Sequence, residues 1–208
     1  MTVALYLAHL NPVTHAHVEI ITELKNSADS VKVMPVVFRD GDREINSRSF
    51  PFDYPTRKKM LESVFGDSIG ITDDYAFEAP FKKYLPPLVR SRSWRLRRQI
   101  LRGVEGDYFS YTGDRTEGYM LKAYGLHPRV GQRKQISATS VKEKLFGSAL
   151  GGGQEWRSDV PEGVAGIITG SWAVVEKYAG MEDLTNRVAG MKFPKEGWSD
   201  AGGAGHRD

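Results

Sequence analysis

The chain contains no cysteine among its 208 residues. Disulfide bonds, cysteine-ligated zinc or iron–sulfur sites and a cysteine nucleophile are therefore excluded. Long hydrophobic runs are also missing, since no segment approaches the roughly 18 consecutive apolar residues that a membrane-spanning helix needs. The apolar opening over residues 3–10 has neither a preceding Lys or Arg nor a small-residue cleavage pattern, so we expect no secretory signal. These absences predict a cytoplasmic protein with no membrane partner.

The charge of the chain is small but unevenly placed. The formal net charge is +3, with 40% hydrophobic and 26% charged residues, which is ordinary for a globular domain. Residues 82–102 hold eight Lys or Arg and no Asp or Glu, so this basic segment carries +8 and the rest of the chain −5. With Trp94 inside it, the basic segment is typical of a solvated helix face or of a nucleic-acid contact.

Short apolar stretches rich in β-forming residues alternate with amphipathic stretches along the chain. Strands are expected at residues 3–7, 31–38, 69–72, 107–112 and 129–132. Helices are expected from residue 14, over 55–65, 96–104, 116–124 and 140–146, and from residue 161. This alternation predicts an α/β fold with a parallel sheet flanked by helices, whose ligands bind beyond the carboxyl ends of the strands. Pro35 is awkward within the second strand, and residues 39–53 are expected to form a loop.

We expect one domain over residues 1–180, with a helical part toward the C-terminus. Residues 181–208 are expected to be a C-terminal extension whose last dozen residues, with four glycines, form a frayed tail.

A polar constellation, Asn11-Pro-Val-Thr-His-Ala-His17, follows the first predicted strand. Thr14 and His17 are three residues apart and share a helix face, whereas His15 is turned away by roughly 200°. The first turn of a helix presents unpaired N–H groups and the positive end of the helix dipole, both of which attract phosphate. Alternatively, Thr14 only caps the helix and His17 is an interior histidine.

A second constellation, around residues 136–143, combines hydroxyl groups with a lysine. Ser140 followed by Glu143 predicts a capping box at a helix start. Ser137 and Thr139 exceed what one cap requires, and with free N–H groups and Lys142 they predict a second phosphate site. Two such helix starts at the strand ends of one sheet could hold a polyphosphate between them.

Together, the two constellations resemble the HxGH and ISxTxxR signatures of the nucleotidyltransferase superfamily. Residues 112–115 with 119–121, and residues 156–161, are similar to segments of nicotinamide-nucleotide adenylyltransferases of the archaeal type. The resemblance runs with gaps from about Val3 to Ile168. The chain departs from the pattern at Ala16, which replaces a glycine, and at Lys142 and His9, which stand where arginine is frequent.

The resemblance implies a Rossmann-like domain that transfers AMP from ATP to a phosphomonoester. Nicotinamide mononucleotide is the favoured acceptor, NAD and pyrophosphate are the products, and Mg²⁺ is expected to arrive with ATP. The implied catalytic residues are His17, Thr14 and Lys142. The implied nucleotide-binding residues are Ala8, His9, Leu10, Gly113, Asp114, Arg115, Ile136, Ser137 and Thr139. The implied acceptor-binding residues are Asn11 and Trp94, and no residue is assigned to a metal.

Three alternatives stay open at this point. The chain could be a cytidylyltransferase, an enzyme similar to pantetheine-phosphate adenylyltransferase, or a non-catalytic relative that binds nucleic acid through the basic segment. The enzyme interpretations predict no nucleic-acid partner. They leave the acceptor, the choice between ATP and CTP, and assembly into a homo-oligomer open.

Overall fold

The computed structural model describes residues 1–85, 90–132, 134, 136–188 and 191–199. Its centre is a five-stranded sheet of order β5-β2-β1-β7-β8 in which every pairing is parallel. The strands are β1 (Thr2–Ala8), β2 (Ser30–Pro35), β5 (Gly70–Ile71), β7 (Asp107–Thr112) and β8 (Pro128–Val130). The predicted α/β fold with a Rossmann-like parallel sheet is therefore confirmed.

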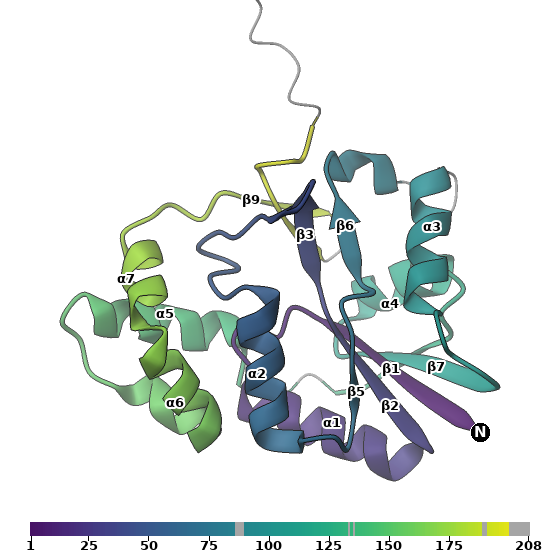
Figure 1. Ribbon diagram of the computed structural model, residues 1–208, viewed down its shortest axis with the longest axis horizontal. Coiled ribbons are helices and arrows are strands. Elements are labelled where there is room, and N and C mark those ends of the chain that lie inside the picture. Colours follow the sequence, from purple (N-terminus) through teal and green to yellow (C-terminus); the bar gives the residue numbers. More distant parts are fainter. Residues whose placement is uncertain (86–89, 133, 135, 189–190, 200–208) are drawn as a thin grey trace, which may run out of the picture.

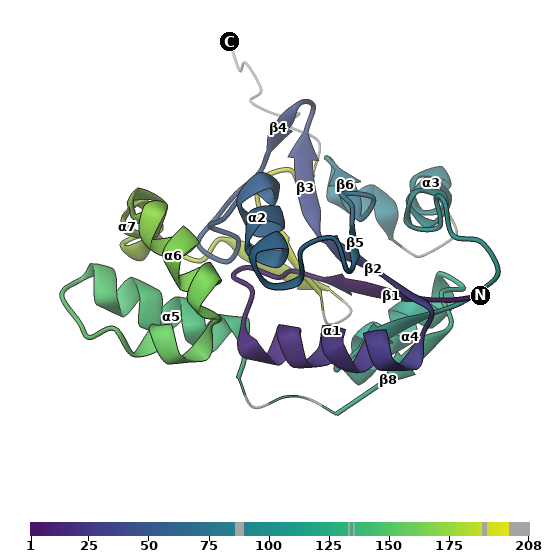
Figure 2. The ribbon, with the colours of Figure 1, turned by 60° about the horizontal axis from the view of Figure 1, so that its bottom comes forward.

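Seven α-helices surround this sheet in the part of the chain that the structure describes (Figure 1). They are α1 (His15–Ser27), α2 (Tyr54–Phe65), α3 (Ser91–Ile100), α4 (Arg115–Ala123), α5 (Ala138–Ala149), α6 (Glu162–Gly170) and α7 (Trp172–Ala179). Short 3₁₀ helices occupy Phe81–Tyr84 and Glu155–Asp159. Both ribbon views place α5, α6 and α7 at one end of the molecule and α3 at the other (Figures 1 and 2). None of the helices described is long and apolar enough to cross a membrane.

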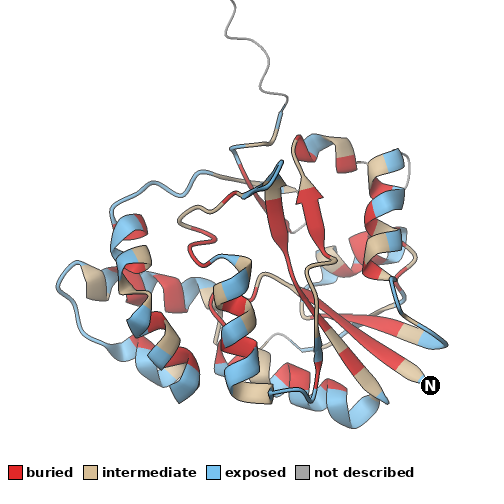
Figure 3. Cartoon of the chain, viewed as in Figure 1, coloured by how far each residue is buried: buried red, intermediate tan, exposed pale blue. Residues whose placement is uncertain are grey.

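The central strand β1 separates two hydrophobic cores. Because side chains alternate along a strand, Ala4 and Tyr6 face one core, and Val3, Leu5 and Leu7 face the other. The first core lies against α1, α2, α5, α6 and α7, and the second against α3 and α4. Burial on both faces explains why β1 reads as a continuous apolar run, and Figure 3 shows it as buried along most of its length.

The predicted strand over residues 31–38 is wrong in its length, because the chain changes sheets at Pro35. The parallel register of β1 with β2 ends at Ala8 opposite Pro35, and the Val36 N–H makes the last hydrogen bond between the two segments, to the Ala8 carbonyl at 2.9 Å. The Val37 N–H then donates to the Tyr75 carbonyl at 3.0 Å. From this point the chain belongs to a second sheet, of order β4-β3-β6.

This second sheet also corrects the loop predicted for residues 39–53. Its strands are β3 (Val37–Asp40), β4 (Arg43–Glu44) and β6 (Ala76–Glu78). The segment therefore begins with a short β3–β4 hairpin. Only the stretch from Ile45 to Asp53 connects it to α2, which has Pro55 in its first turn and ends at Gly66 with a φ of 53°, as predicted.

Residues 181–199 contain a hairpin that the sequence analysis does not predict. Its strands are β9 (Thr185–Val188) and β10 (Met191–Pro194), so this part of the extension is not helical. Met191 and Phe193 are buried in the second core, where the Phe193 ring lies 5.5 Å from Phe38 and 5.3 Å from Phe77. Most of the predicted tail, residues 200–208, lies outside the described residues. The division of the chain at residue 180 stays a prediction.

The position of Phe193 can be tested by truncating its side chain. Phe193→Ala is expected to lower the free energy of unfolding by about 3–5 kcal/mol, because removing a buried ring leaves a cavity. Tyr119→Ala is the control: that side chain is 75% exposed, and its loss is expected to change stability by less than about 0.5 kcal/mol. Urea unfolding measures both values, and an equally small loss for Phe193→Ala would contradict the placement of the hairpin in the core.

Candidate functional site

The strand order identifies the edge of the sheet where a ligand is expected. From β1 the chain builds the sheet outward through β2 and β5 on one side and through β7 and β8 on the other. In open parallel sheets of this kind, ligands bind beyond the carboxyl ends of the strands at the point where the order reverses. The segments that follow β1 and β7 are residues 9–14 and residues 113–114, so two of the three predicted nucleotide-binding segments lie at this edge.

Thr14 and His17 form one unit at the start of α1. Thr14 is the N-cap and is fully buried, and the Thr14 N–H donates to Nδ1 of His17 at 3.0 Å. The Thr14 Oγ1 lies 3.1 Å from the same nitrogen. His17 thus takes the place that Glu or Gln has in an ordinary capping box. Thr14 thus holds the imidazole in place, and its predicted catalytic role stays a prediction. His15 is exposed on the other side of the helix, as predicted.

This capping arrangement sets the protonation state of His17. Its Nδ1 accepts a backbone N–H, so the neutral ring carries its proton on Nε2. Burial, together with the positive charge of Lys142, lowers the pKa of His17 to about 4. At neutral pH His17 is therefore an uncharged donor with a fixed ring orientation.

Lys142 connects α5 to the loop after β1. Its side chain is buried, and its ammonium group donates to the Asn11 carbonyl at 3.0 Å. Burial and the nearby charge of Lys192 lower its pKa to about 8. This bond brings the second constellation to the first, as the sequence predicts from two helix starts at the strand ends of one sheet.

The helix start at α5 differs from the prediction. The N-cap is Ser137, whose side chain accepts the Ser140 N–H at 3.1 Å, so the capping box assigned to Ser140 and Glu143 is wrong. Ser140 is already helical, and Glu143 pairs with Arg48 at 2.8 Å. The Ser137 hydroxyl can still donate its proton, and Thr139 is exposed in the first turn, where backbone N–H groups have no partner within the helix.

Asn11 is fully buried, and its side chain makes two hydrogen bonds to the backbone of Phe52. The amide nitrogen donates to the Phe52 carbonyl at 2.7 Å, and the amide oxygen accepts the Phe52 N–H at 3.1 Å. Leu10, also buried, has a φ of 49°, which turns the chain between β1 and Asn11. Ala8 and Ile136 are half-buried and pack against the first core. Contact of these residues with a nucleotide or an acceptor stays a prediction.

His9 lies on the same loop, and its ring stacks on Phe50 at a centroid distance of 4.7 Å. Burial and the nearby cations, Lys142 first among them, lower its pKa to about 3, so the ring is neutral. Its Nδ1 is buried and has no hydrogen-bond partner among the described residues. A buried polar atom without a partner is costly, and a bound ligand or a water molecule can satisfy it.

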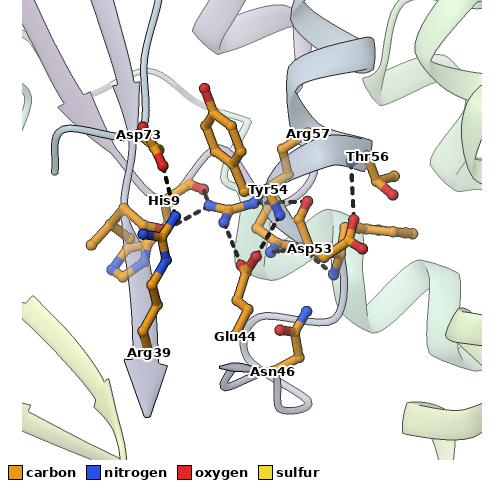
Figure 4. A network of polar contacts seen from close by, with 12 residues as sticks. His9, Arg39, Glu44, Asn46, Asp53, Tyr54, Thr56, Arg57 and Asp73 are labelled. Atoms are coloured by element: carbon orange, nitrogen blue, oxygen red, sulfur yellow. Dashed lines mark hydrogen bonds and ion pairs between the residues drawn. The ribbon is translucent and has the colours of Figure 1, made fainter. Parts of the chain in front are cut away.

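A buried arginine fixes the backbone of this loop. Arg57, on α2, donates to the carbonyls of His9 at 2.9 Å and of Val36 at 2.7 Å, and it pairs with Glu44 at 2.8 Å. Figure 4 shows this network, in which Asp53 also caps α2 through the Thr56 N–H. Because its guanidinium group is occupied by these contacts, Arg57 fixes the backbone of the loop after β1 and is not itself free to bind a ligand.

The segment after β7 reaches the same edge of the sheet but has its own internal contacts. The Asp114 side chain accepts the Glu117 N–H at 3.0 Å and caps α4, while the Asp114 N–H donates to the Thr112 hydroxyl at 3.1 Å. Gly113 is half-buried, and Asp114 and Arg115 are exposed. They are therefore accessible, and their predicted role beside the base and ribose remains a prediction.

Trp94 is not brought together with His17 and Lys142. It is 48% exposed on α3, which both ribbon views place at the end of the molecule opposite α5. Several cations of the basic segment hold protein carbonyls instead of facing a ligand. Arg92 donates to the carbonyls of Glu78 and Ala79, and Arg97 to that of Tyr124.

The structure adds three polar residues that the sequence analysis did not select. Lys192 on β10 donates to the Ser49 hydroxyl at 3.0 Å and pairs with Asp183 at 3.1 Å. They belong to no motif, and Ser49 is more than 130 residues from the other two, so only the fold brings it to them. Within the described residues, no group of three His, Asp or Glu side chains is placed to hold a metal ion.

A parallel sheet of this order with two polar helix starts at its switch point defines a Rossmann-like α/β domain. No family model matches the chain, and no curated protein matches its sequence. Among solved structures, it is similar to a bifunctional NMN adenylyltransferase/ADP-ribose pyrophosphatase from Francisella tularensis. The TM-score is 0.60 at 13% identity, over 87% of this chain and 50% of that one.

Two further solved structures bear on the same comparison. The Francisella protein in complex with AMP and a manganese ion gives a TM-score of 0.61 at 13% identity, over 86% of this chain and 52% of that one. A protein from Vibrio parahaemolyticus assigned as a nicotinate-nucleotide adenylyltransferase gives a TM-score of 0.54 at 12% identity, over 85% of this chain and 96% of that one. The chain thus spans about half the length of the bifunctional protein. These similarities establish the fold.

The state of His17 can be read directly by NMR. At pH 6.0 we expect ¹⁵N spectra to show a neutral ring with the proton on Nε2, because its Nδ1 accepts the Thr14 N–H and its pKa is lowered to about 4. The lowered pKa also means that the unfolded chain binds this proton more readily, so stability falls as the pH drops from about 6.5 toward 4. A doubly protonated His17 ring at pH 6.0 would contradict the arrangement.

Proposed function

We propose that the chain is a nucleotidyltransferase that transfers AMP from ATP to nicotinamide mononucleotide, forming NAD and pyrophosphate. The observation that carries the proposal is that two groups lie near one another beyond the carboxyl end of β1: a neutral His17, whose ring is held by the Thr14 N–H, and the buried Lys142. The fold shared with solved adenylyltransferases supports the reaction class, and the sequence resemblance supports nicotinamide mononucleotide as the acceptor.

The proposed chemistry is an in-line displacement that needs no protein nucleophile. A phosphate oxygen of the acceptor forms a bond to the α-phosphorus of ATP, and the bond from that phosphorus to the bridging oxygen of the β-phosphate breaks, releasing pyrophosphate. The attacking phosphate is already an anion, so no general base is required. Catalysis then depends on positioning and on stabilising charge as it develops.

Each residue of the site has a part in this proposal. The Nε2–H of His17 donates to an oxygen of the reacting phosphate, and the Lys142 ammonium group offsets negative charge beside it. Ser137, Thr139 and the first-turn N–H groups of α5 bind the β- and γ-phosphates. Mg²⁺ would come bound to the ATP oxygens and neutralise part of their charge, since the described residues offer it no carboxylate cage.

The proposal is tested by measuring pyrophosphate release from ATP or CTP with a panel of acceptors. We expect release with ATP and nicotinamide mononucleotide, and NAD as the second product. Nicotinate mononucleotide and phosphopantetheine, and CTP in place of ATP, separate the neighbouring specificities. If no pair releases pyrophosphate, and single-stranded oligonucleotide binds with a steep dependence on salt, the non-catalytic alternative is favoured instead.

His17→Asn separates catalysis from folding. The Asn amide oxygen lies close to where Nδ1 was and can still accept the Thr14 N–H, but the donor at Nε2 is lost. We expect the turnover number to fall by about 100-fold or more, with an unfolding midpoint close to that of the unchanged protein. His15→Asn, on the exposed side of the same helix turn, is the matched control and should keep full turnover. Equal activity in both variants would remove His17 from the mechanism.

The lowered pKa of Lys142 predicts a pH dependence. Because kcat/KM reports the free enzyme, it should decline as the pH rises through about 8, where Lys142 loses its charge. In Lys142→Arg this decline should move to a higher pH, since a guanidinium group keeps its proton there. A decline that stays near pH 8 in Lys142→Arg would assign it to another group.

A further inference from the structure

The direction of the Lys192 side chain follows from the alternation of side chains along strand β10. Its neighbours Met191 and Phe193 are buried in the second core, so the Lys192 side chain projects from the opposite face of the strand. There its ammonium group lies 3.0 Å from the Ser49 hydroxyl and 3.1 Å from the Asp183 carboxylate. The Ser49 hydroxyl donates to the same carboxylate at 2.9 Å, which closes a three-membered polar cluster.

This cluster is joined to the candidate site by the segment around Ser49. Phe50 follows Ser49, and its ring stacks on His9. Arg48 precedes Ser49 and pairs with Glu143, the residue next to Lys142. The segment therefore ties the C-terminal hairpin both to the loop after β1 and to α5.

Two observations point to an anion in this region. The positive charge of Lys192 lowers the pKa of Lys142 and of His9, which means that two lysines and a histidine are close enough to influence one another. The Nδ1 of His9 is buried without a partner among the described residues. An anion with several acceptor oxygens would relieve the repulsion between the lysines and could bond to that nitrogen in its protonated tautomer. A phosphate group has this chemistry.

We propose that Lys192 is a phosphate-binding residue, which completes an anion site with Lys142 and His9 and is delivered to it by the C-terminal hairpin. The inference rests on the proposed function, which brings two phosphate-bearing substrates to this site. The phosphate belongs to either the nucleotide or the acceptor, and kinetics can separate the two.

The simpler role for Lys192 is to anchor Asp183 and Ser49, and a pair of variants distinguishes the two. Lys192→Met removes the charge from the site. Asp183→Asn breaks the ion pair but leaves the Lys192 charge, so a phosphate-binding Lys192 should bind its ligand as well as before or more tightly. If Lys192 were only an anchor, Asp183→Asn would weaken binding as much as Lys192→Met.

The experiment is a calorimetric titration of the whole chain with inorganic pyrophosphate. We expect Lys192→Met to bind about 10- to 100-fold more weakly, the range for losing one hydrogen bond to a charged group. Lys195→Met, an exposed lysine on the same hairpin, is the matched control and should bind like the unchanged protein. A rise in KM for ATP alone in Lys192→Met assigns the phosphate to the nucleotide, and a rise for the acceptor alone assigns it to the acceptor.

Two results would overturn the inference while leaving the proposed function standing. These are unchanged pyrophosphate binding in Lys192→Met together with an unchanged KM for both substrates, and equal weakening in Asp183→Asn and Lys192→Met, each in a protein that still releases pyrophosphate from ATP. If the unchanged protein binds no pyrophosphate and releases none from ATP, both the inference and the proposed function fail.

Discussion

A buried hydrogen bond, from the Lys142 ammonium group to the Asn11 carbonyl, joins the two halves of the candidate site. Lys142 is separated from Asn11 by 131 residues, and the bond places the start of α5 beside the start of α1. It also requires a well-formed loop after β1, because only a fixed carbonyl can compensate a buried amine. Arg57 and Asn11 supply that rigidity, Arg57 by holding the His9 carbonyl and Asn11 by holding the Phe52 backbone.

The segment between β4 and α2 is the second element on which the site depends. Asn11 holds its Phe52 end, Arg48 pairs with Glu143 and donates to the Tyr178 carbonyl, and Ser49 contacts Asp183. Such a charged, turn-rich stretch looks like a free loop in sequence, but here it is fastened to α5, α7 and the C-terminal hairpin. Apart from Asn11, these partners are more than 90 residues away in the chain.

The sequence predicts those features that depend on local spacing. The apolar run of β1, the shared face of Thr14 and His17, and the presence of Pro55 in the first turn of α2 follow from periodicity and capping rules. What it could not predict depends on tertiary partners. The change of sheet at Pro35 requires β6 as an alternative neighbour, the capping role of Ser137 competes with an equally good candidate at Ser140, and Lys192 belongs to no motif at all. The predicted neighbourhood of Trp94 depends on where α3 packs, which the spacing of its apolar residues leaves undetermined.

The position of the hairpin at the C-terminal end of the chain affects the order in which parts of the fold can form during synthesis. The five-stranded sheet is complete once residue 130 has been synthesised, whereas Met191, Lys192 and Phe193 come more than 60 residues later. A nascent chain can therefore form the sheet and the Thr14–His17 unit while its second core still lacks the rings and the strand that cover Phe38 and Phe77. That aromatic surface is covered only when the last strand arrives, and exposed apolar surface of this kind makes incomplete chains prone to aggregation.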